Sequence, residues 1–236
     1  KVKGNPAPKI IDTLSPCVIR IDGDCCFAPL ALHEYGLPKL IEVTKRFGVG
    51  VLRLNNVHHF AALFHETEAL AQAGLVGLAC TNYKPAVAPS NATEAFFGTN
   101  PISFAYPRLH QEPVVYDMAT STMAMGEVEI AARDNQSVEK GTGLSQDGKL
   151  TTNPADIVNG GVLLPFGGHK GSAISMMVEL LTGGLTGDNF SYQSQTEDNN
   201  DGGPARGGQF VLAMSPELIA GPGHYDHSEG FFAHMK

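Results

Sequence analysis

The sequence predicts an α/β fold, because strand-like and helix-like stretches alternate along most of the chain. Residues 18–22 (Val-Ile-Arg-Ile-Asp) alternate in the way that a strand does. The stretch that begins at Pro29 has apolar residues near helical spacing and is closed by Gly48 and Gly50. The same cycle of strand, loop and helix then continues, and some adjacent strands are short enough to pair antiparallel.

The remaining elements follow from the same patterns and from turn residues. In chain order we expect a strand at 49–55, a helix at 61–73, strands at 75–81, 102–106 and 114–117, a helix from about 122 to 133, a helix from Gly171 and a strand at 209–214. Residues 134–159 are rich in turn signals, and the polar residues 193–208 are expected to form an exposed loop. A chain of 236 residues is sufficient for one large domain or two small ones.

Composition and charge exclude several classes of partner. Hydrophobic residues make up 42% of the chain and charged residues 17%, as in ordinary globular proteins. No apolar run reaches the roughly 18 residues of a membrane span. The net charge is −8 and no dense basic cluster exists, so we expect neither a nucleic-acid partner nor a membrane partner. The four cysteines have neither metal-ligand spacing nor the density of a disulfide scaffold, which favours a reducing cytoplasm.

The most informative motif is Phe166-Gly-Gly-His-Lys-Gly-Ser172, which joins a Pro-ended apolar segment to a helix. Its glycines can bring backbone N–H groups and the positive end of a helix dipole close to a phosphate. Lys170 would add a charge and His169 a hydrogen-bond donor. The alternative is a glycine-rich turn with two polar surface residues. No Gly-x-Gly-x-x-Gly follows a predicted strand, so a dinucleotide would not be bound through the Rossmann fingerprint.

Two adjacent histidines, His58 and His59, lie between a predicted strand and a predicted helix, where functional side chains are commonly displayed. The pair is a conceivable metal ligand. No Cys, Asp or Glu accompanies it at ligand spacing, whereas zinc needs three or four ligands, so we predict no metal site.

Three further polar positions have an ordinary structural interpretation beside a functional one. In Asp117-Met-Ala-Thr-Ser121, Thr120 or Ser121 is a candidate helix N-cap. Glu127 on the next helix has no cation four residues later, so it is either exposed or serves a site. Thr99 stands in a turn with an exposed hydroxyl, which is more often structural.

Taken together, four ordered blocks resemble the signature of the malate/L-lactate dehydrogenase family that lacks a Rossmann fold. The blocks are His58–Ala62, Phe97–Pro101, Asp117–Ser121 and Leu164–Gly171. The resemblance covers about residues 18 to 221. It is closest to the branch that reduces Δ1-piperideine-2-carboxylate and Δ1-pyrroline-2-carboxylate, as the stretches Val57–Leu63 and Ser172–Leu181 indicate.

The resemblance implies a non-Rossmann dinucleotide-binding domain with a largely antiparallel mixed sheet flanked by helices, in a homodimer. The nicotinamide of NADPH or NADH would face a small carboxylate substrate. Thr99 would bind this substrate, and Glu127 would be catalytic. The residues implied to bind the cofactor are His58, His59, Phe60, Ala61, Ala62, Asp117, Met118, Ala119, Met125, Gly126, His169 and Lys170.

The chain departs from the family pattern in two respects. Glu127 stands where the imine reductases have a charge-relay Asp, and Met125-Gly126 stands where close relatives have His-Gly. The resemblance also places a proton-donating Ser-His-Gly segment ahead of Lys1 and a last cofactor-contacting segment beyond Lys236. Residues 1–236 would then be the central part of the enzyme, without its N-terminal and C-terminal helical segments, and would not turn over substrate alone.

The leading hypothesis is NADPH-dependent reduction of the C=N bond of a cyclic imino acid, giving L-proline or L-pipecolate. An alternative within the family is an NAD-dependent 2-hydroxyacid or ureidoglycolate-type dehydrogenase. An alternative of another class is a catalytically inactive remnant that binds a nucleotide or a partner. The motifs do not choose between NADPH and NADH.

Overall fold

The computed structural model describes residues 1–11, 15–59, 62–198 and 203–235. The chain forms two compact units, each built from segments that are distant in sequence. Unit 1 contains Lys1–Cys80, Ile102–Asp117 and Gly208–Lys236, and unit 2 contains Thr81–Pro101 and Met118–Gly207.

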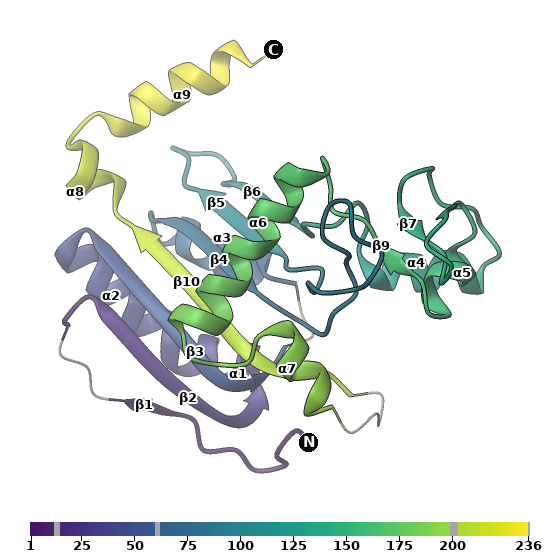
Figure 1. The fold of residues 1–236 in the computed structure, drawn as a ribbon. Coiled ribbons are helices and arrows are strands. Elements are labelled where there is room, and N and C mark those ends of the chain that lie inside the picture. Colours follow the sequence, from purple (N-terminus) through teal and green to yellow (C-terminus); the bar gives the residue numbers. More distant parts are fainter. Residues whose placement is uncertain (12–14, 60–61, 199–202, 236) are drawn as a thin grey trace. The chain divides into compact units, whose positions relative to one another are not determined.

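Unit 1 is built on a seven-stranded sheet with the order β1-β2-β3-β10-β4-β5-β6 (Figure 1). The strands are β1 (Lys9–Ile11), β2 (Val18–Phe27), β3 (Val49–His58), β4 (Val76–Thr81), β5 (Ile102–Tyr106), β6 (Val114–Met118) and β10 (Arg206–Met214). β1 and β2 pair antiparallel, β2 and β3 pair parallel, and β4 and β5 pair antiparallel. Figure 1 shows β10 running opposite to β2 and β3. The predicted mixed sheet is thereby confirmed.

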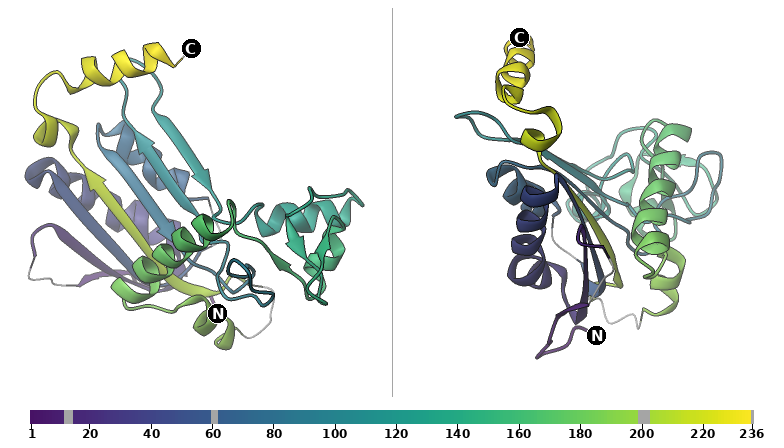
Figure 2. Two further views of the ribbon diagram at one scale, coloured as in Figure 1. Left: turned by 45° about the horizontal axis from the view of Figure 1, so that its top comes forward. Right: turned by 90° about the vertical axis from the view of Figure 1, so that its left-hand side faces the viewer.

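The helices in the N-terminal part of unit 1 bury apolar side chains against this sheet. The predicted helix from Pro29 is one continuous run of α1 (Ala28–Ala31), a π-helical turn η1 (Leu32–Gly36) and α2 (Leu37–Phe47), and α3 (Phe64–Gln72) contacts α2. Figure 2 shows α2 against one face of the sheet. Leu32 and Leu40 share a fully buried core with Ile21 and Leu54, and each such side chain contributes about 1.5–3 kcal/mol when it leaves water.

The C-terminal part of unit 1 contains two helices that the sequence patterns did not predict, α8 (Pro216–Ala220) and α9 (His224–His234). Arg108, in the loop that follows β5, pairs with Glu229 on α9 at 2.5 Å. The Arg108 guanidinium also lies over the Phe232 ring, 4.3 Å from its centroid. Side-chain contacts with a distant loop, rather than an apolar period, therefore fix α9.

Unit 2 has short elements around a small core. They are α4 (Met125–Arg133), α5 (Pro154–Val158), α6 (His169–Glu179), a π-helical segment η2 (Leu180–Leu185), α7 (Ser191–Thr196) and the strands β7 (Gly143–Leu144), β8 (Leu150–Thr151) and β9 (Val162–Leu163). The three strands form a sheet with the order β8-β7-β9. Val87 pairs with both Phe97 and Leu163 through isolated bridges, and these side chains pack on Val128 of α4.

The expected exposed loop at 193–208 is wrong at both of its ends. Its first residues belong to α7, where Ser191 and Ser194 are buried, and its last belong to β10. The Gln193 side chain accepts the Phe190 backbone N–H at 2.9 Å, and the Ser194 hydroxyl donates to the Arg206 carbonyl at 2.8 Å. Polar residues are buried here because their hydrogen bonds are satisfied inside the protein, which hydrophobic periodicity does not register.

Two features of the described residues bear on function. No helix among them is both long enough and apolar enough to span a bilayer. Within the same residues, no group of three or more His, Cys, Asp or Glu side chains is arranged to hold a metal ion.

Candidate functional site

The histidine pair lies at the end of β3 in unit 1, and both side chains are buried, with exposed fractions of 5% for His58 and 8% for His59. The prediction that this turn displays them is wrong, because β3 stays paired with β2 as far as His58, opposite Phe27. Burial lowers the pKa of His59 to about 4, so its imidazole is neutral at pH 7. Ala62 is exposed, and the predicted cofactor residues Phe60 and Ala61 lie outside the described residues.

One observation in unit 1 fits a polar ligand near the histidine pair, and a second shows how Asp117 is held. The buried Nε2 of His59 has no hydrogen-bond partner among the described residues. Asp117 at the end of β6 accepts the backbone N–H of Phe64 at 3.0 Å. Asp117 thus reaches the start of α3, the helix that follows the His58–Ala62 block.

The glycine motif of unit 2 has the geometry of an anion cradle. Gly167 and Gly168 have φ angles of 59° and 62°, and the first turn of α6 begins at His169 without a side-chain cap. A Cβ atom at Gly171 would lie 2.0 Å from the Phe166 carbonyl oxygen, so glycine is required there. His169 and Lys170 are exposed. Uncapped N–H groups, a helix dipole and a lysine together fit a phosphate or carboxylate group.

Three of the four sequence blocks meet at Thr120 in unit 2. Its backbone N–H and its hydroxyl donate to the Thr99 carbonyl at 2.8 and 3.1 Å. Its own carbonyl accepts the Phe166 N–H at 3.1 Å, and its hydroxyl accepts that of Ser175 at 2.9 Å. The interpretation of Thr120 or Ser121 as an N-cap is wrong, because α4 begins later, at Met125. Thr120 instead joins the loops.

Glu127 is exposed on the first turn of α4, where its carboxylate accepts the Ala124 N–H at 3.2 Å. This contact satisfies one of the free N–H groups at the start of the helix. Met125 packs against the small core of unit 2, while Gly126 is exposed. Met118 is exposed and Ala119 half-buried. The catalytic role of Glu127 stays a prediction, and the structure adds a local structural role.

Sequence reasoning missed the residues that hold these loops. Ser172, Ser175 and Glu179 occupy one face of α6, and each makes hydrogen bonds to another segment of unit 2. Polar residues at positions i, i+3 and i+7, which share one face of a helix, were the available signal. In unit 1 the fully buried Glu66 was also missed.

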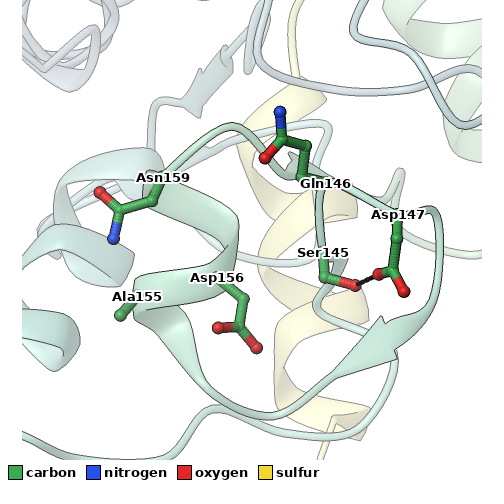
Figure 3. A pocket seen from close by; sticks show the side chains of 6 residues that line it. All are labelled: Ser145, Gln146, Asp147, Ala155, Asp156 and Asn159. Carbon is green, nitrogen blue, oxygen red and sulfur yellow. Dashed lines mark hydrogen bonds between the residues drawn. The ribbon is translucent and has the colours of Figure 1, made fainter.

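A pocket on unit 2, drawn in Figure 3, lies away from these blocks in sequence. It is lined by Ser145, Gln146, Asp147, Ala155, Asp156 and Asn159. Asp147 is already hydrogen-bonded to Ser145 and Lys149, and Asp156 to Thr151 and Asn153. Because its carboxylates are engaged and no block residue lines it, we assign no function to this pocket.

The family model for malate/L-lactate dehydrogenase matches residues 1–236. The chain belongs to this family. Two curated relatives bear the name Δ1-pyrroline-2-carboxylate/Δ1-piperideine-2-carboxylate reductase. The one from Pseudomonas putida is 41% identical over 235 residues, which cover 100% of this chain and 68% of the relative. The one from Pseudomonas syringae pv. tomato is 41% identical over 228 residues, covering 97% of this chain and 66% of the relative. This chain thus spans about two thirds of their length.

Solved structures agree with this assignment. The crystal structure of Δ1-piperideine-2-carboxylate reductase from Pseudomonas syringae has a TM-score of 0.93 and 41% identity, and the match covers 99% of this chain and 70% of that one. Sulfolactate dehydrogenase from Methanocaldococcus jannaschii has a TM-score of 0.86 and 28% identity, covering 100% of this chain and 67% of that one. The chain therefore belongs to a family of oxidoreductases, and this family implies a nicotinamide cofactor.

Proposed function

We propose that the intact protein reduces the C=N bond of Δ1-pyrroline-2-carboxylate or Δ1-piperideine-2-carboxylate with NADPH, giving L-proline or L-pipecolate. The observation that carries the proposal is the meeting of three blocks at Thr120, which brings the Thr99 loop and the α6 anion cradle into one hydrogen-bonded assembly. The 41% identity to reductases of this name over the whole chain supports the choice of substrate.

The chain's own residues would bind and orient the reactants. Lys170, His169 and the uncapped start of α6 would hold an anionic group of the cofactor. The Thr99 hydroxyl would bind the substrate, and the free Nε2 of His59 would accept a hydrogen bond from the cofactor. When bound, the nicotinamide would supply the hydride. Glu127 would orient the group that delivers a proton to the imine nitrogen.

A panel assay tests this proposal. The intact enzyme is given pyrroline-2-carboxylate, pyruvate and oxaloacetate, each with NADPH and with NADH, and cofactor oxidation is followed. We expect the highest kcat/KM for the cyclic imine with NADPH. Preference for a 2-oxoacid would favour the hydroxyacid-dehydrogenase alternative, which the 28% identity to sulfolactate dehydrogenase keeps open. Dinucleotide binding without turnover would favour an inactive remnant.

The family resemblance also leads us to propose a homodimer. Sedimentation of the intact protein at micromolar concentration should give the mass of two chains, and a monomer over the active concentration range would contradict this.

A further inference from the structure

One face of α6 anchors several segments of unit 2 through polar side chains. The Ser172 hydroxyl accepts the Ser90 backbone N–H at 2.8 Å, and the Ser175 hydroxyl donates to that of Thr120 at 2.9 Å. Glu179, at the C-terminal end of the same helix, has an exposed fraction of only 6%. A buried carboxylate is tolerated only where donors replace the water it has lost.

The donors around Glu179 come from three separate segments and are all uncharged. Its Oε1 accepts the side-chain amide of Asn100 at 2.9 Å and also the Ser191 hydroxyl. Its Oε2 accepts the backbone N–H of Ser191 at 3.0 Å and the side-chain amide of Asn82 at 3.3 Å. No lysine or arginine within the described ranges forms an ion pair with this carboxylate. Its negative charge is therefore held by directed hydrogen bonds, which fix geometry more tightly than a flexible cation does.

Two of the residues that donate to Glu179, Asn100 and Ser191, hold the backbone on the two sides of Thr99. Asn100 has a φ of 41°, a conformation that asparagine tolerates better than most residues, and its amide also donates to the Ser175 carbonyl at 3.1 Å. On the other side, the Gly98 N–H donates to the Ser191 hydroxyl at 3.1 Å. The Thr99 carbonyl is taken by Thr120. Thr99 thus stands on a backbone that is fixed at each neighbouring residue.

We propose that Glu179 is the positioning residue for Thr99, so that it sets affinity for the substrate and not for the cofactor. This inference rests on the proposed function, in which Thr99 binds the substrate. Glu179 itself is buried and would not touch the substrate. It acts through Asn100 and through Ser191.

The Glu179→Gln variant tests the proposal with little change in volume. Each carboxylate oxygen of Glu179 accepts hydrogen bonds from two donors. In the glutamine variant one of the two oxygens becomes an N–H₂ group, which cannot accept, so two of these hydrogen bonds are lost in either orientation of the amide. We expect the substrate KM to rise about tenfold, as the loss of a hydrogen bond to a charged group typically gives. The dissociation constant of NADPH, measured by its fluorescence, should stay within about twofold. Equal changes in both constants, or no change in either, would overturn the proposal.

A matched pair of variants covers the case in which Glu179→Gln does not fold. Asn100→Gly and Asn82→Gly each remove one amide from Glu179, but only Asn100 adjoins Thr99. Glycine tolerates the φ of 41° at Asn100, and each amide also donates to one backbone carbonyl, so the two losses are comparable. We expect Asn100→Gly to raise the substrate KM about tenfold and Asn82→Gly to change it less than threefold, by the same reasoning. Equal effects of the two variants would overturn the proposal.

The constants are measured with whichever panel substrate the wild-type enzyme reduces. A wrong substrate class therefore appears in the wild-type panel, whereas a wrong role for Glu179 appears in the comparison of variants. The two failures give different results.

Discussion

Units 1 and 2 each bury a glutamate on a helix, and the two differ in their partners. Glu179 on α6 has an exposed fraction of 6% and accepts hydrogen bonds from Asn82, Asn100 and Ser191. Glu66 on α3 has an exposed fraction of 0%, and no hydrogen bond of ordinary geometry reaches either of its carboxyl oxygens among the described residues. Burial alone therefore does not indicate whether a carboxyl group holds neighbouring segments together or lowers the stability of the fold.

The cost at Glu66 appears in its protonation. Burial raises the pKa of Glu66 to about 7, a backbone N–H and the neighbouring Gln209 side chain lower it in part, and the charge of Asp117 raises it. The Gln209 amide is fully buried beside it and also has no hydrogen bond of good geometry. Near pH 7 the group consequently exchanges between a neutral and a charged buried form.

The largest expected effect is a gain in stability for Glu66→Gln. The pKa of Glu66 is about 7 in the folded protein against 4.5 for a glutamate in water, so the unfolded chain releases this proton first as the pH rises. Folding therefore loses stability between these values, by about 3 kcal/mol once the pH exceeds 7. Replacing the carboxyl by an amide should recover most of that amount at pH 8 and almost none at pH 4.5.

Urea denaturation followed by circular dichroism measures this change, since the chain has no tryptophan. Glu68→Gln on the same helix is the control for removing a negative charge. Equal stability of the wild type and Glu66→Gln at pH 8 would show that water or a rearrangement solvates the Glu66 carboxylate.

The same substitution at the other glutamate should have the opposite sign. Glu179→Gln places an N–H₂ group against donors, and we expect the free energy of unfolding at pH 8 to fall by about 2 kcal/mol. The same denaturation experiment applies. If Glu179→Gln were as stable as the wild type, its hydrogen bonds would be replaceable, and the contrast between the two glutamates would disappear.

The contrast between Glu66 and Glu179 shows which parts of the fold and of the candidate site can be predicted from the sequence. Apolar periodicity and glycines predicted β5 at Ile102–Tyr106, the helical run that ends at Phe47, and the turn before α6, because these depend on local pattern. The four blocks of candidate site residues came from the family resemblance. Nothing in the sequence near Glu66 or Glu179 distinguishes the two residues, because their neighbours in space, Gln209 and Asn82, are distant in the chain. Only the tertiary fold gives hydrogen-bond donors to Glu179 and none of ordinary geometry to Glu66. The burial of His59 was missed for the same reason.

The two ends of α6 offer a further comparison, between its buried carboxylate and its exposed cation. Lys170 lies on the first turn, where the helix has no side-chain cap, and it is exposed. Lys170→Ala should raise the KM of the cofactor by about tenfold or more, because a charge-assisted hydrogen bond to an anion contributes roughly 1–3 kcal/mol. Stability should barely change. An unaltered cofactor KM in steady-state kinetics would remove α6 from the cofactor site.

A third glutamate separates exposure from function. Glu127 is exposed and accepts the Ala124 N–H, a contact that glutamine also makes, so Glu127→Gln should leave stability unchanged. If Glu127 orients the proton donor, kcat should fall about tenfold, a small part of what general acid catalysis contributes, with cofactor affinity unchanged. An unaltered kcat would leave Glu127 with its structural contact alone.

The smallest effect is expected in the pH dependence of the wild type, because two buried groups of unit 1 oppose each other. Burial lowers the pKa of His59 from 6.5 to about 4, so the unfolded chain takes up this proton first and stability falls as the pH drops below 6.5. Glu66 has the reverse slope between 4.5 and about 7. Each slope approaches about 1.4 kcal/mol per pH unit, so the two should nearly cancel between pH 4.5 and 6.5.

Single substitutions should reveal each slope. In Glu66→Gln only the contribution of His59 remains, so stability should fall as the pH is lowered from 6.5 to 4.5. In His59→Leu only the contribution of Glu66 remains, so stability should fall as the pH is raised from 4.5 to 6.5. Urea denaturation at intervals of half a pH unit distinguishes these profiles. If stability depended on pH in the same way in the wild type and in both variants, neither His59 nor Glu66 would have the shifted pKa that its burial implies.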